Sequence, residues 1–265
     1  MPTGTSFRAP WAIRVILALL LLVCAPRAWA QELHVMTSGA FTAAFLEIAP
    51  QFEQTARMKV ATAFGASMGG APDSIPSRLD RREPADVVIL AREALDDLVT
   101  RGHLVSGSQV DLVRSSIGMA VRAGAPKPDI SSVDALRRTL LNAKSIAYSA
   151  SASGVYLSTE LFPRLGIADA IKSKSQRIES ERVGTIVARG DAEIGFQQIS
   201  ELLPIAGIDI VGPLPAGAQR VTVFSAGIAA GSKNVEAAKA LIQFLSSAAV
   251  APVITRTGLE PVGVR

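Results

Sequence analysis

The chain of 265 residues is short of the residues that most often carry chemistry, with one cysteine, two histidines and two tryptophans. The cysteine, Cys24, lies in an apolar stretch near the N-terminus, so the rest of the chain has no thiol for a disulfide, a metal site or a nucleophile. The histidines, His34 and His103, are far apart, and no tight carboxylate cluster accompanies them. The cysteine, histidine and carboxylate residues therefore lack the spacing of metal ligands, and we expect neither a metal nor a cofactor.

Aromatic rings are also scarce, at 5% of the chain. Trp11 and Trp29 both lie within the first 30 residues, and the only tyrosines are Tyr148 and Tyr156. Sugar rings usually stack on aromatic side chains, so the shortage disfavours a carbohydrate ligand. A small ligand of another kind needs no aromatic ring, and the two interpretations stay open.

Residues 31–265 also have little net charge. The first 30 residues contain three basic residues (Arg8, Arg14 and Arg27) and no acidic one. The whole chain has a formal net charge of +4, so the chain without these residues has a net charge of +1. A near-neutral chain is poorly suited to hold a phosphate backbone, and we expect no nucleic-acid partner.

Residues 1–30 have the pattern of a cleaved signal peptide. Arg8 and Arg14 precede an apolar run over 15–23, and Ala28-Trp29-Ala30 forms a small-x-small cleavage site. We therefore expect export to the periplasm and a mature chain that begins at Gln31. Lipid attachment at Cys24 is the alternative, although Val23 is larger than the residue that lipoprotein signals prefer there.

The rest of the chain alternates strand-like and helix-like segments, which predicts an α/β fold with mostly parallel sheets flanked by helices. Ser38 stands where it could cap the helix over 39–56. The expected strands are 33–37, 59–64, 85–91, 116–121, 144–148, 193–197, 209–211 and 220–225. The expected helices are 39–56, 73–82, 92–101, 131–142, 155–165, 183–189, 235–246 and 248–257.

Two loops rich in serine and glycine connect a strand to a helix, one in each half of the chain. They lie at 65–70 (Gly-Ala-Ser-Met-Gly-Gly) and 149–154 (Ser-Ala-Ser-Ala-Ser-Gly). Glycines admit a close backbone approach, and a helix start offers unpaired N–H donors, which together suit an anion. Ligands of open parallel sheets bind beyond the carboxyl ends of the strands. We therefore expect two lobes that face a cleft.

The crossing segments that best separate such lobes are 113–121 and 220–229, because both are extended and free of proline. They predict one lobe from 31–115 and 220–265 and a second lobe from 116–219.

The first loop also matches the Gly-x-Ser-x-Gly nucleophile elbow, with Ser67 as the nucleophile of a serine hydrolase. That arrangement needs a histidine base late in the chain, and none follows His103. The hydrolase is therefore the weaker hypothesis. The structural alternative is that Ser67 and Ser153 only cap their helices.

Five short motifs follow one another along the chain: Met-Thr-Ser-Gly-Ala-Phe-Thr at 36–42, Phe-Gly-Ala-Ser at 64–67, Pro-Ala-Asp-Val at 84–87, Ser-Gly-Val-Tyr at 153–156 and Ile-Gly-Phe-Gln-Gln at 194–198. In this order and spacing, the chain from about 33 to 262 resembles the molybdate/oxyanion-binding family of ABC-transporter periplasmic substrate-binding proteins (type 2). The resemblance implies a two-lobed clamshell, without catalysis, that closes on a small anion and delivers it to an inner-membrane permease. We further expect a monomer.

The resemblance also implies which residues hold the anion, through hydroxyls and backbone N–H groups. The positions expected to bind are Ser38, Gly39, Ala40, Ser67, Met68, Ser153, Gly154, Ser180 and Gln198.

Two positions depart from the family pattern, since Ala40 replaces a serine and Gln198 replaces a tyrosine. The segment 179–182 (Glu-Ser-Glu-Arg) is also charged where the family is usually neutral. Molybdate or tungstate is the leading ligand. A small organic acid is the alternative, because an asymmetric anion could use Gln198 and Arg182 together.

Overall fold

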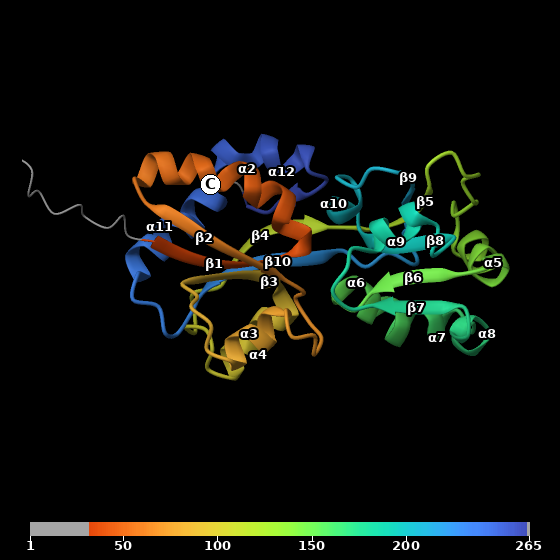
Figure 1. Cartoon of the computed structure of the whole chain (residues 1–265), viewed down its shortest axis with the longest axis horizontal. Coiled ribbons are helices and arrows are strands. Elements are labelled where there is room, and N and C mark those ends of the chain that lie inside the picture. Colours follow the sequence, from red (N-terminus) through yellow and green to blue (C-terminus); the bar gives the residue numbers. More distant parts are fainter. Residues whose placement is uncertain (1–31, 264–265) are drawn as a thin grey trace, which may run out of the picture. The chain divides into compact units, whose positions relative to one another are not determined.

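The fold is that of a computed structural model, whose described residues are 32–263. The predicted signal peptide lies outside these residues. The chain forms two β-sheets flanked by helices. In Figure 1 the first sheet contains both the red N-terminal and the blue C-terminal strands, and the second sheet contains the strands between them. The predicted two-lobed α/β fold is confirmed.

The first sheet has six strands in the order β11-β4-β10-β3-β1-β2. Its strands are β1 (Glu32–Ser38), β2 (Lys59–Gly65), β3 (Val87–Ala91), β4 (Val110–Ser115), β10 (Thr222–Ile228) and β11 (Glu260–Pro261). Its helices are α2 (Gly39–Ala56), α3 (Ile75–Asp80), α4 (Arg92–Thr100), α11 (Val235–Leu245), a 3₁₀ turn at Ala248–Val250 and α12 (Ala251–Arg256).

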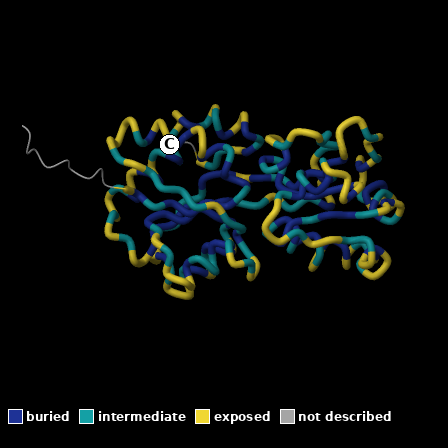
Figure 2. The backbone as a smooth tube through the Cα atoms, viewed as in Figure 1, coloured by how far each residue is buried: buried dark blue, intermediate teal, exposed yellow. Residues whose placement is uncertain are grey.

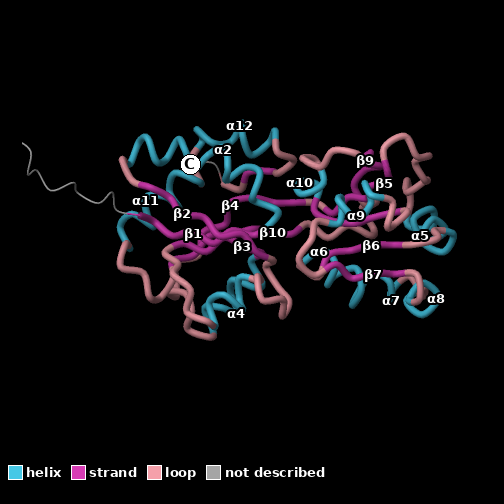
Figure 3. The backbone as a smooth tube through the Cα atoms, viewed as in Figure 1, coloured by secondary structure: helices cyan, strands magenta, loops and turns pink. Residues whose placement is uncertain are grey.

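The second sheet has five strands in the order β7-β6-β8-β5-β9. Its strands are β5 (Ile117–Arg122), β6 (Ile146–Ser149), β7 (Ser175–Ile178), β8 (Ile194–Gln198) and β9 (Ile208–Pro213). Its helices are α5 (Val133–Asn142), α6 (Ala152–Tyr156), a π-helical turn at Leu157–Leu161, α7 (Phe162–Arg164), α8 (Ala168–Lys172), α9 (Val183–Arg189) and α10 (Ile199–Leu202). Figure 3 distinguishes helices from strands along the backbone.

Helices cover both faces of each sheet, and buried residues follow the strands between them (Figure 2). In α2, Phe41, Phe45 and Phe52 recur at helical spacing and pack with α11 and α12 on one face of the first sheet. The helices α3 and α4 pack on the opposite face around Leu95 and Leu98. In the second lobe, α9 covers one face and the helices from α5 to α8 cover the other.

The sheets are mixed rather than mostly parallel. β1 pairs in parallel with β2 and β3, and β6 pairs in parallel with β7 and β8. The strands next to the crossings pair antiparallel, because the chain leaves the first sheet through β4 and returns to it through β10. The parallel pairs place the carboxyl ends of neighbouring strands at one edge, where Ser38 lies opposite Gly65 in the register.

The chain passes between the sheets twice, at Ser116 and over residues 214–221. Gln219 joins the two passages, because its Oε1 accepts from the Ile117 N–H and its Nε2 donates to the Ile117 C=O, each at 2.9 Å. Ser116 lies within the expected segment 113–121, whereas the second passage overlaps the expected segment 220–229 only at 220–221. The exact division into lobes at 115/116 and 219/220 stays a prediction.

Most expected elements have a counterpart, but five short ones were not predicted: β4, α8, β7, α10 and β11. β7 is four residues long with two exposed polar side chains, and α10 is a single helical turn directly after β8. Neither is long enough to show a hydrophobic period. Within residues 32–263 no single helix is long and apolar enough to cross a membrane. The helix α11 and the segment Ala248–Arg256 reach that length and composition only when taken together, and they are bent by 54° relative to each other.

Asp86 ties three segments of the first lobe together. Its carboxylate accepts hydrogen bonds from the His34 backbone N–H (2.8 Å), Ser232 Oγ (2.6 Å) and the Asn234 side chain (3.2 Å). Burial by itself raises the pKa of Asp86, but these hydrogen bonds outweigh it, and the pKa lies below its ordinary value.

We expect Asp86→Ala to lower the free energy of unfolding by about 1–3 kcal/mol, because three donors lose a buried acceptor. Since the folded-state pKa is depressed, the stabilisation is present above the unfolded-state pKa and is lost as the pH falls through the folded-state value. Urea unfolding at neutral and acidic pH measures both effects. Asp97→Ala is the control, because that side chain is 64% exposed; an equal loss in both variants would contradict the assignment.

Candidate functional site

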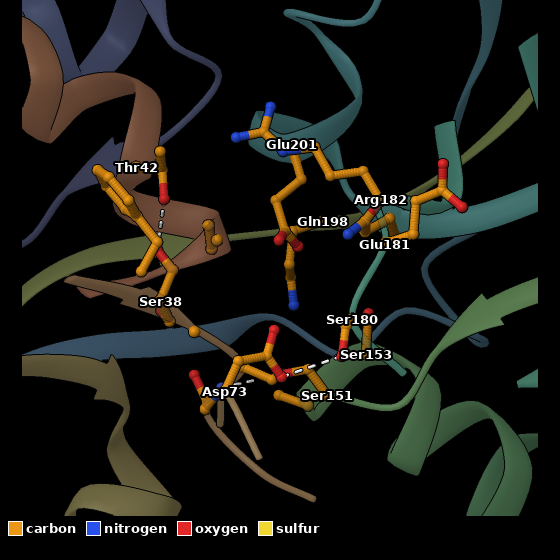
Figure 4. Close-up of a pocket in the computed structure, with 18 of the residues that line it drawn as sticks. Ser38, Thr42, Asp73, Ser151, Ser153, Ser180, Glu181, Arg182, Gln198 and Glu201 are labelled. Atoms are coloured by element: carbon orange, nitrogen blue, oxygen red, sulfur yellow. Dashed lines mark hydrogen bonds between the residues drawn. The ribbon is translucent and has the colours of Figure 1, made fainter. Parts of the chain in front are cut away.

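A pocket of about 370 Å³ lies where loops of the two sheets meet, and Figure 4 shows the side chains around it. This volume falls in the range of small-ligand sites, roughly 300–1,000 Å³. The first lobe contributes Ser38, Gly39, Ala40, Thr42, Leu46, Phe64, Gly65, Ala66, Ser67, Asp73 and Phe224. The second lobe contributes Ser151, Ala152, Ser153, Glu179, Ser180, Glu181, Arg182, Gln197, Gln198 and Glu201.

Seven of the nine expected binding residues therefore line one pocket, and two do not. Met68 packs with the apolar core around α3 and α4. Gly154 is buried beneath the pocket, where a Cβ would collide with the Ser149 carbonyl oxygen. Sequence reasoning included both because they are neighbours of serines that do reach the pocket.

Ser38 has a buried hydroxyl at the start of α2. The residue occupies the N-cap position, but its Oγ makes no capping hydrogen bond. The residue is 2% exposed, and among residues 32–263 no hydrogen-bond partner for its Oγ is present. An unpaired buried hydroxyl is costly, so Ser38 offers a hydrogen bond to whatever enters the pocket.

Ser67 is fully buried, and its Oγ accepts a hydrogen bond from the Ala91 N–H at 3.1 Å. This bond holds the loop after β2 against the end of β3. The Ser67 N–H donates to Ser151 Oγ of the second lobe, also at 3.1 Å. Ser67 is therefore no helix cap, since α3 is capped by Ser74.

The second loop is arranged around a hydroxyl pair. Ser153 is 2% exposed, and its Oγ lies 3.1 Å from Ser149 Oγ, with either group able to donate. Ser153 also does not cap its helix, because Ser151 occupies the N-cap position of α6. One hydroxyl proton in the pair is left over to donate to a ligand.

The alternative of a serine hydrolase lacks its histidine base at the pocket. His103 Nε2 lies 3.0 Å from Asp80, and His34 Nδ1 lies 3.7 Å from Asp86. Both are absent from the residues that line the pocket around Ser67. A serine without a neighbouring histidine base remains a weak nucleophile.

Charged side chains of the pocket are mostly paired. Ser180 Oγ donates to Asp73 Oδ1 at 3.0 Å across the cleft, drawn as a dashed line in Figure 4. Glu179 pairs with Arg177 at 3.3 Å, and Glu181 pairs with Arg189.

Arg182 is the charged side chain of segment 179–182 that is not paired with an opposite charge in the described part of the chain. It lines the pocket and has no ion pair with a carboxylate among the described residues. The pocket thus keeps one uncommitted cation for an anionic ligand.

Gln198 lies between the two passages of the chain. With its amide oxygen and nitrogen assigned from their surroundings, the nitrogen donates to Ser115 Oγ (2.9 Å) and the Ser116 carbonyl (3.2 Å). The oxygen accepts from Thr222 Oγ1 at 3.2 Å. Gln198 was expected to contact the ligand, but these bonds commit its side-chain amide to the passages between the sheets.

Glu201 on α10 was missed by sequence reasoning. It lines the pocket, and burial raises the pKa of Glu201 to about 7, although Arg182, Gln197 and the Gln198 backbone act in the opposite direction. A carboxyl that titrates near neutrality can hold or release a proton at physiological pH. The sequence signal was weak, because Glu201 is one acidic residue in a four-residue helix.

The fold and this interlobe pocket define a solute-binding protein. A family model described as bacterial extracellular solute-binding protein matches residues 33–260, and the chain belongs to this family. The predicted resemblance is confirmed.

Individual relatives differ in what they are named for. The chain is 48% identical over 249 residues (93% of this chain, 95% of the relative) to an aconitate isomerase from a Pseudomonas species. It is 28% identical over 253 residues (92% and 95%) to the molybdate-binding protein ModA of Azotobacter vinelandii. The solved structure of the Azotobacter vinelandii periplasmic molybdate-binding protein has a TM-score of 0.68 at 20% identity, covering 88% of this chain and 100% of that one.

The prediction that the chain is not an enzyme is wrong, because the relative at 48% identity is named as an isomerase. That prediction rested on the resemblance to transport proteins and on the absence of a histidine late in the chain. The anion-type loops do not support it, because loops of hydroxyls and N–H groups bind an anion equally well in a receptor and in an enzyme. They carry no information about turnover.

Ser67 and Ser38 form a matched pair for a stability test. In the ligand-free protein, we expect Ser67→Ala to lower the free energy of unfolding by about 1–3 kcal/mol, because the Ala91 N–H loses its acceptor. Ser38→Ala removes a hydroxyl without a partner and leaves that free energy unchanged or slightly higher. Urea unfolding of the two variants checks this. A larger loss for Ser38→Ala than for Ser67→Ala would contradict the assigned roles.

Proposed function

We propose that this protein binds a small polycarboxylate, with aconitate as the leading candidate, and isomerises it. The observation that carries the proposal is the 48% identity, over nearly the full length of both chains, to a protein named aconitate isomerase. The proposal develops the organic-acid alternative that the charged loop at 179–182 suggested.

The donors of the pocket support a carboxylate ligand. Ser38 Oγ is buried without a partner, Arg182 has no ion pair in the described part of the chain, and Ser153 belongs to a hydroxyl pair with a proton to spare. Carboxylates accept hydrogen bonds from hydroxyls and pair bidentately with arginine. The three donors come from both lobes, which suits an anion with several carboxylates rather than one compact charge.

The same features disfavour a bare tetrahedral oxyanion. The family's first-loop serine is Ala40 here, the family's tyrosine is Gln198, and the Gln198 amide is occupied by the chain passages. The carboxyl of Glu201 also faces the pocket. Molybdate binding, as in the 28% identical relative, is therefore the second candidate and an outcome of the test below.

We place this activity in the periplasm, because the family is extracellular and residues 1–30 have the pattern of a signal peptide. Delivery of the bound solute to an inner-membrane permease is compatible with the fold. The monomeric state expected from the sequence stays a prediction.

The first experiment is a direct assay of the purified protein with trans-aconitate. We expect cis-aconitate to accumulate, as measured by chromatographic separation of the two isomers. Isothermal titration calorimetry with aconitate and with molybdate runs in parallel. Molybdate binding without aconitate binding or turnover would reject the proposal in favour of an oxyanion receptor.

The substitution Arg182→Gln tests whether the Arg182 guanidinium binds the anionic ligand. We expect aconitate affinity to fall roughly 10- to 100-fold, because a charge-assisted hydrogen bond contributes about 1.5–3 kcal/mol. Arg177→Gln is the matched control, because that guanidinium lies two residues earlier and already pairs with Glu179. Equal affinities for the Arg182 variant and the wild type would remove Arg182 from the binding site.

A further inference from the structure

The carboxyl of Glu201 is held at the wall of the pocket by a contact that sequence patterns do not reveal. α10 follows β8 directly and packs against α2. An ideal Cβ at Gly39 would lie 2.8 Å from the Glu201 carboxyl carbon and would collide with its Oε1. Any side chain at position 39 would therefore push the carboxyl away, so Gly39 supplies the space that Glu201 occupies.

This arrangement sets Glu201 apart from the other acids of the pocket. Glu179 and Glu181 are exposed and paired with arginines, and Asp73 accepts from Ser180. Glu201 has no ion pair within 4 Å among residues 32–263. The more distant charge of Arg182 and hydrogen bonds from Gln197 and the Gln198 backbone favour its carboxylate form. Figure 4 shows Arg182, Gln198 and Glu201 on the same side of the pocket.

We propose that the Glu201 carboxylate is the catalytic residue that moves a proton between two carbons of the substrate, an assignment that rests on the proposed isomerase function. Gly39 is the positioning residue that seats this carboxylate. The roles follow from the geometry, because Glu201 is the pocket carboxylate that has neither an ion pair nor a hydroxyl donor.

The proton transfer balances within the substrate. Glu201 removes a proton from the methylene carbon of aconitate, and the electron pair of that C–H bond forms a new carbon–carbon double bond. The electrons of the old double bond then form a C–H bond at the former vinyl carbon with the proton that Glu201 carries. Glu201 ends as a carboxylate, and the formula of the substrate is unchanged, so the step needs no oxidant or reductant.

The isomer formed depends on how the pocket holds the methylene arm. The former methylene carbon becomes part of the new double bond, so its conformation at the moment of deprotonation sets cis or trans geometry. Donors such as Ser38 Oγ and Arg182 can fix the carboxylates at either end of the substrate.

The main test replaces the carboxyl with an amide of the same shape. We expect Glu201→Gln to lower kcat for aconitate isomerisation by about 10²–10⁴-fold, the usual contribution of a positioned acid–base group. Calorimetry is expected to show aconitate affinity within about threefold of the wild type. Glu236→Gln is the control, because its side chain is 86% exposed on α11.

The pH profile gives a readout that a structural role would not produce. Since the pKa of Glu201 is about 7, its carboxylate form is lost below that pH, and kcat/KM falls about tenfold per unit. The other charged groups of the pocket are Asp73, Glu179, Glu181 and Arg182, and Glu47 on α2 is exposed and paired with Arg256. An acidic limb that survives in Glu201→Gln would assign the titration to another group.

Gly39→Ala tests the positioning without removing the carboxyl. Alanine is favourable in a helix, and the colliding atoms are the end of a flexible side chain, so we expect the variant to fold. Displacement of the carboxylate is expected to lower kcat at least about tenfold and to shift the acidic limb of the pH profile. This variant decides the assignment if Glu201→Gln does not fold.

The outcomes separate the two proposals. If the wild type shows no isomerisation between about pH 5.5 and 9, the proposed function fails. If the wild type is active and Glu201→Gln retains kcat within about threefold, the assignment of Glu201 fails while the function stands. Unchanged kcat and pH profile in a folded Gly39→Ala would likewise overturn the positioning role.

Discussion

The two passages of the chain between the sheets are the constraint on which the site depends. Gln219 joins them through both the N–H and the C=O of Ile117, and Gln198 adds bonds to Ser116 and Thr222. These bonds are buried or partly buried, where a lost partner is costly. They fix the strand ends of both sheets around one pocket, so that loops far apart in the sequence share a ligand.

Within that pocket, the polar groups divide into those that hold the protein together and those left for a ligand. Ser67 uses its hydroxyl oxygen on the Ala91 N–H, and Glu181 pairs with Arg189. Ser38 and Arg182 retain unused hydrogen-bonding capacity among the described residues. Because a buried polar group without a partner is unfavourable, this division marks the ligand side of the pocket more sharply than the residue types do.

Much of the fold could be predicted from the sequence, because its longer elements repeat apolar residues at a regular period. The helix over 39–56 has the expected bounds, and β1 to β3 lie close to where they were expected. Among the elements that were missed, β7 and α10 are too short to show a period. The mixed sheets were missed as well, because strand direction depends on which sheet the returning chain joins.

The candidate site could also be predicted in part, because the loops that follow the strands are visible in the sequence. Seven expected residues line the pocket because strand-to-helix loops lie at the carboxyl ends of parallel strands. Gln198 was assigned to the ligand because it matches a family position, and only the structure shows its amide bound to the passages between the sheets. Glu201 was missed because its position beside Gly39 comes from contacts between α10 and α2, which are far apart in the chain.

The sequence by itself determined the α/β class, the two anion-type loops and the family resemblance, because these depend on local periodicity and on motifs of adjacent residues. The tertiary structure decided which hydroxyls are already paired, which cation is uncommitted and which carboxyl titrates near neutrality. These properties depend on neighbours that folding brings together across the cleft. The space that Gly39 leaves for Glu201 is one such property, and no local pattern of residues encodes it.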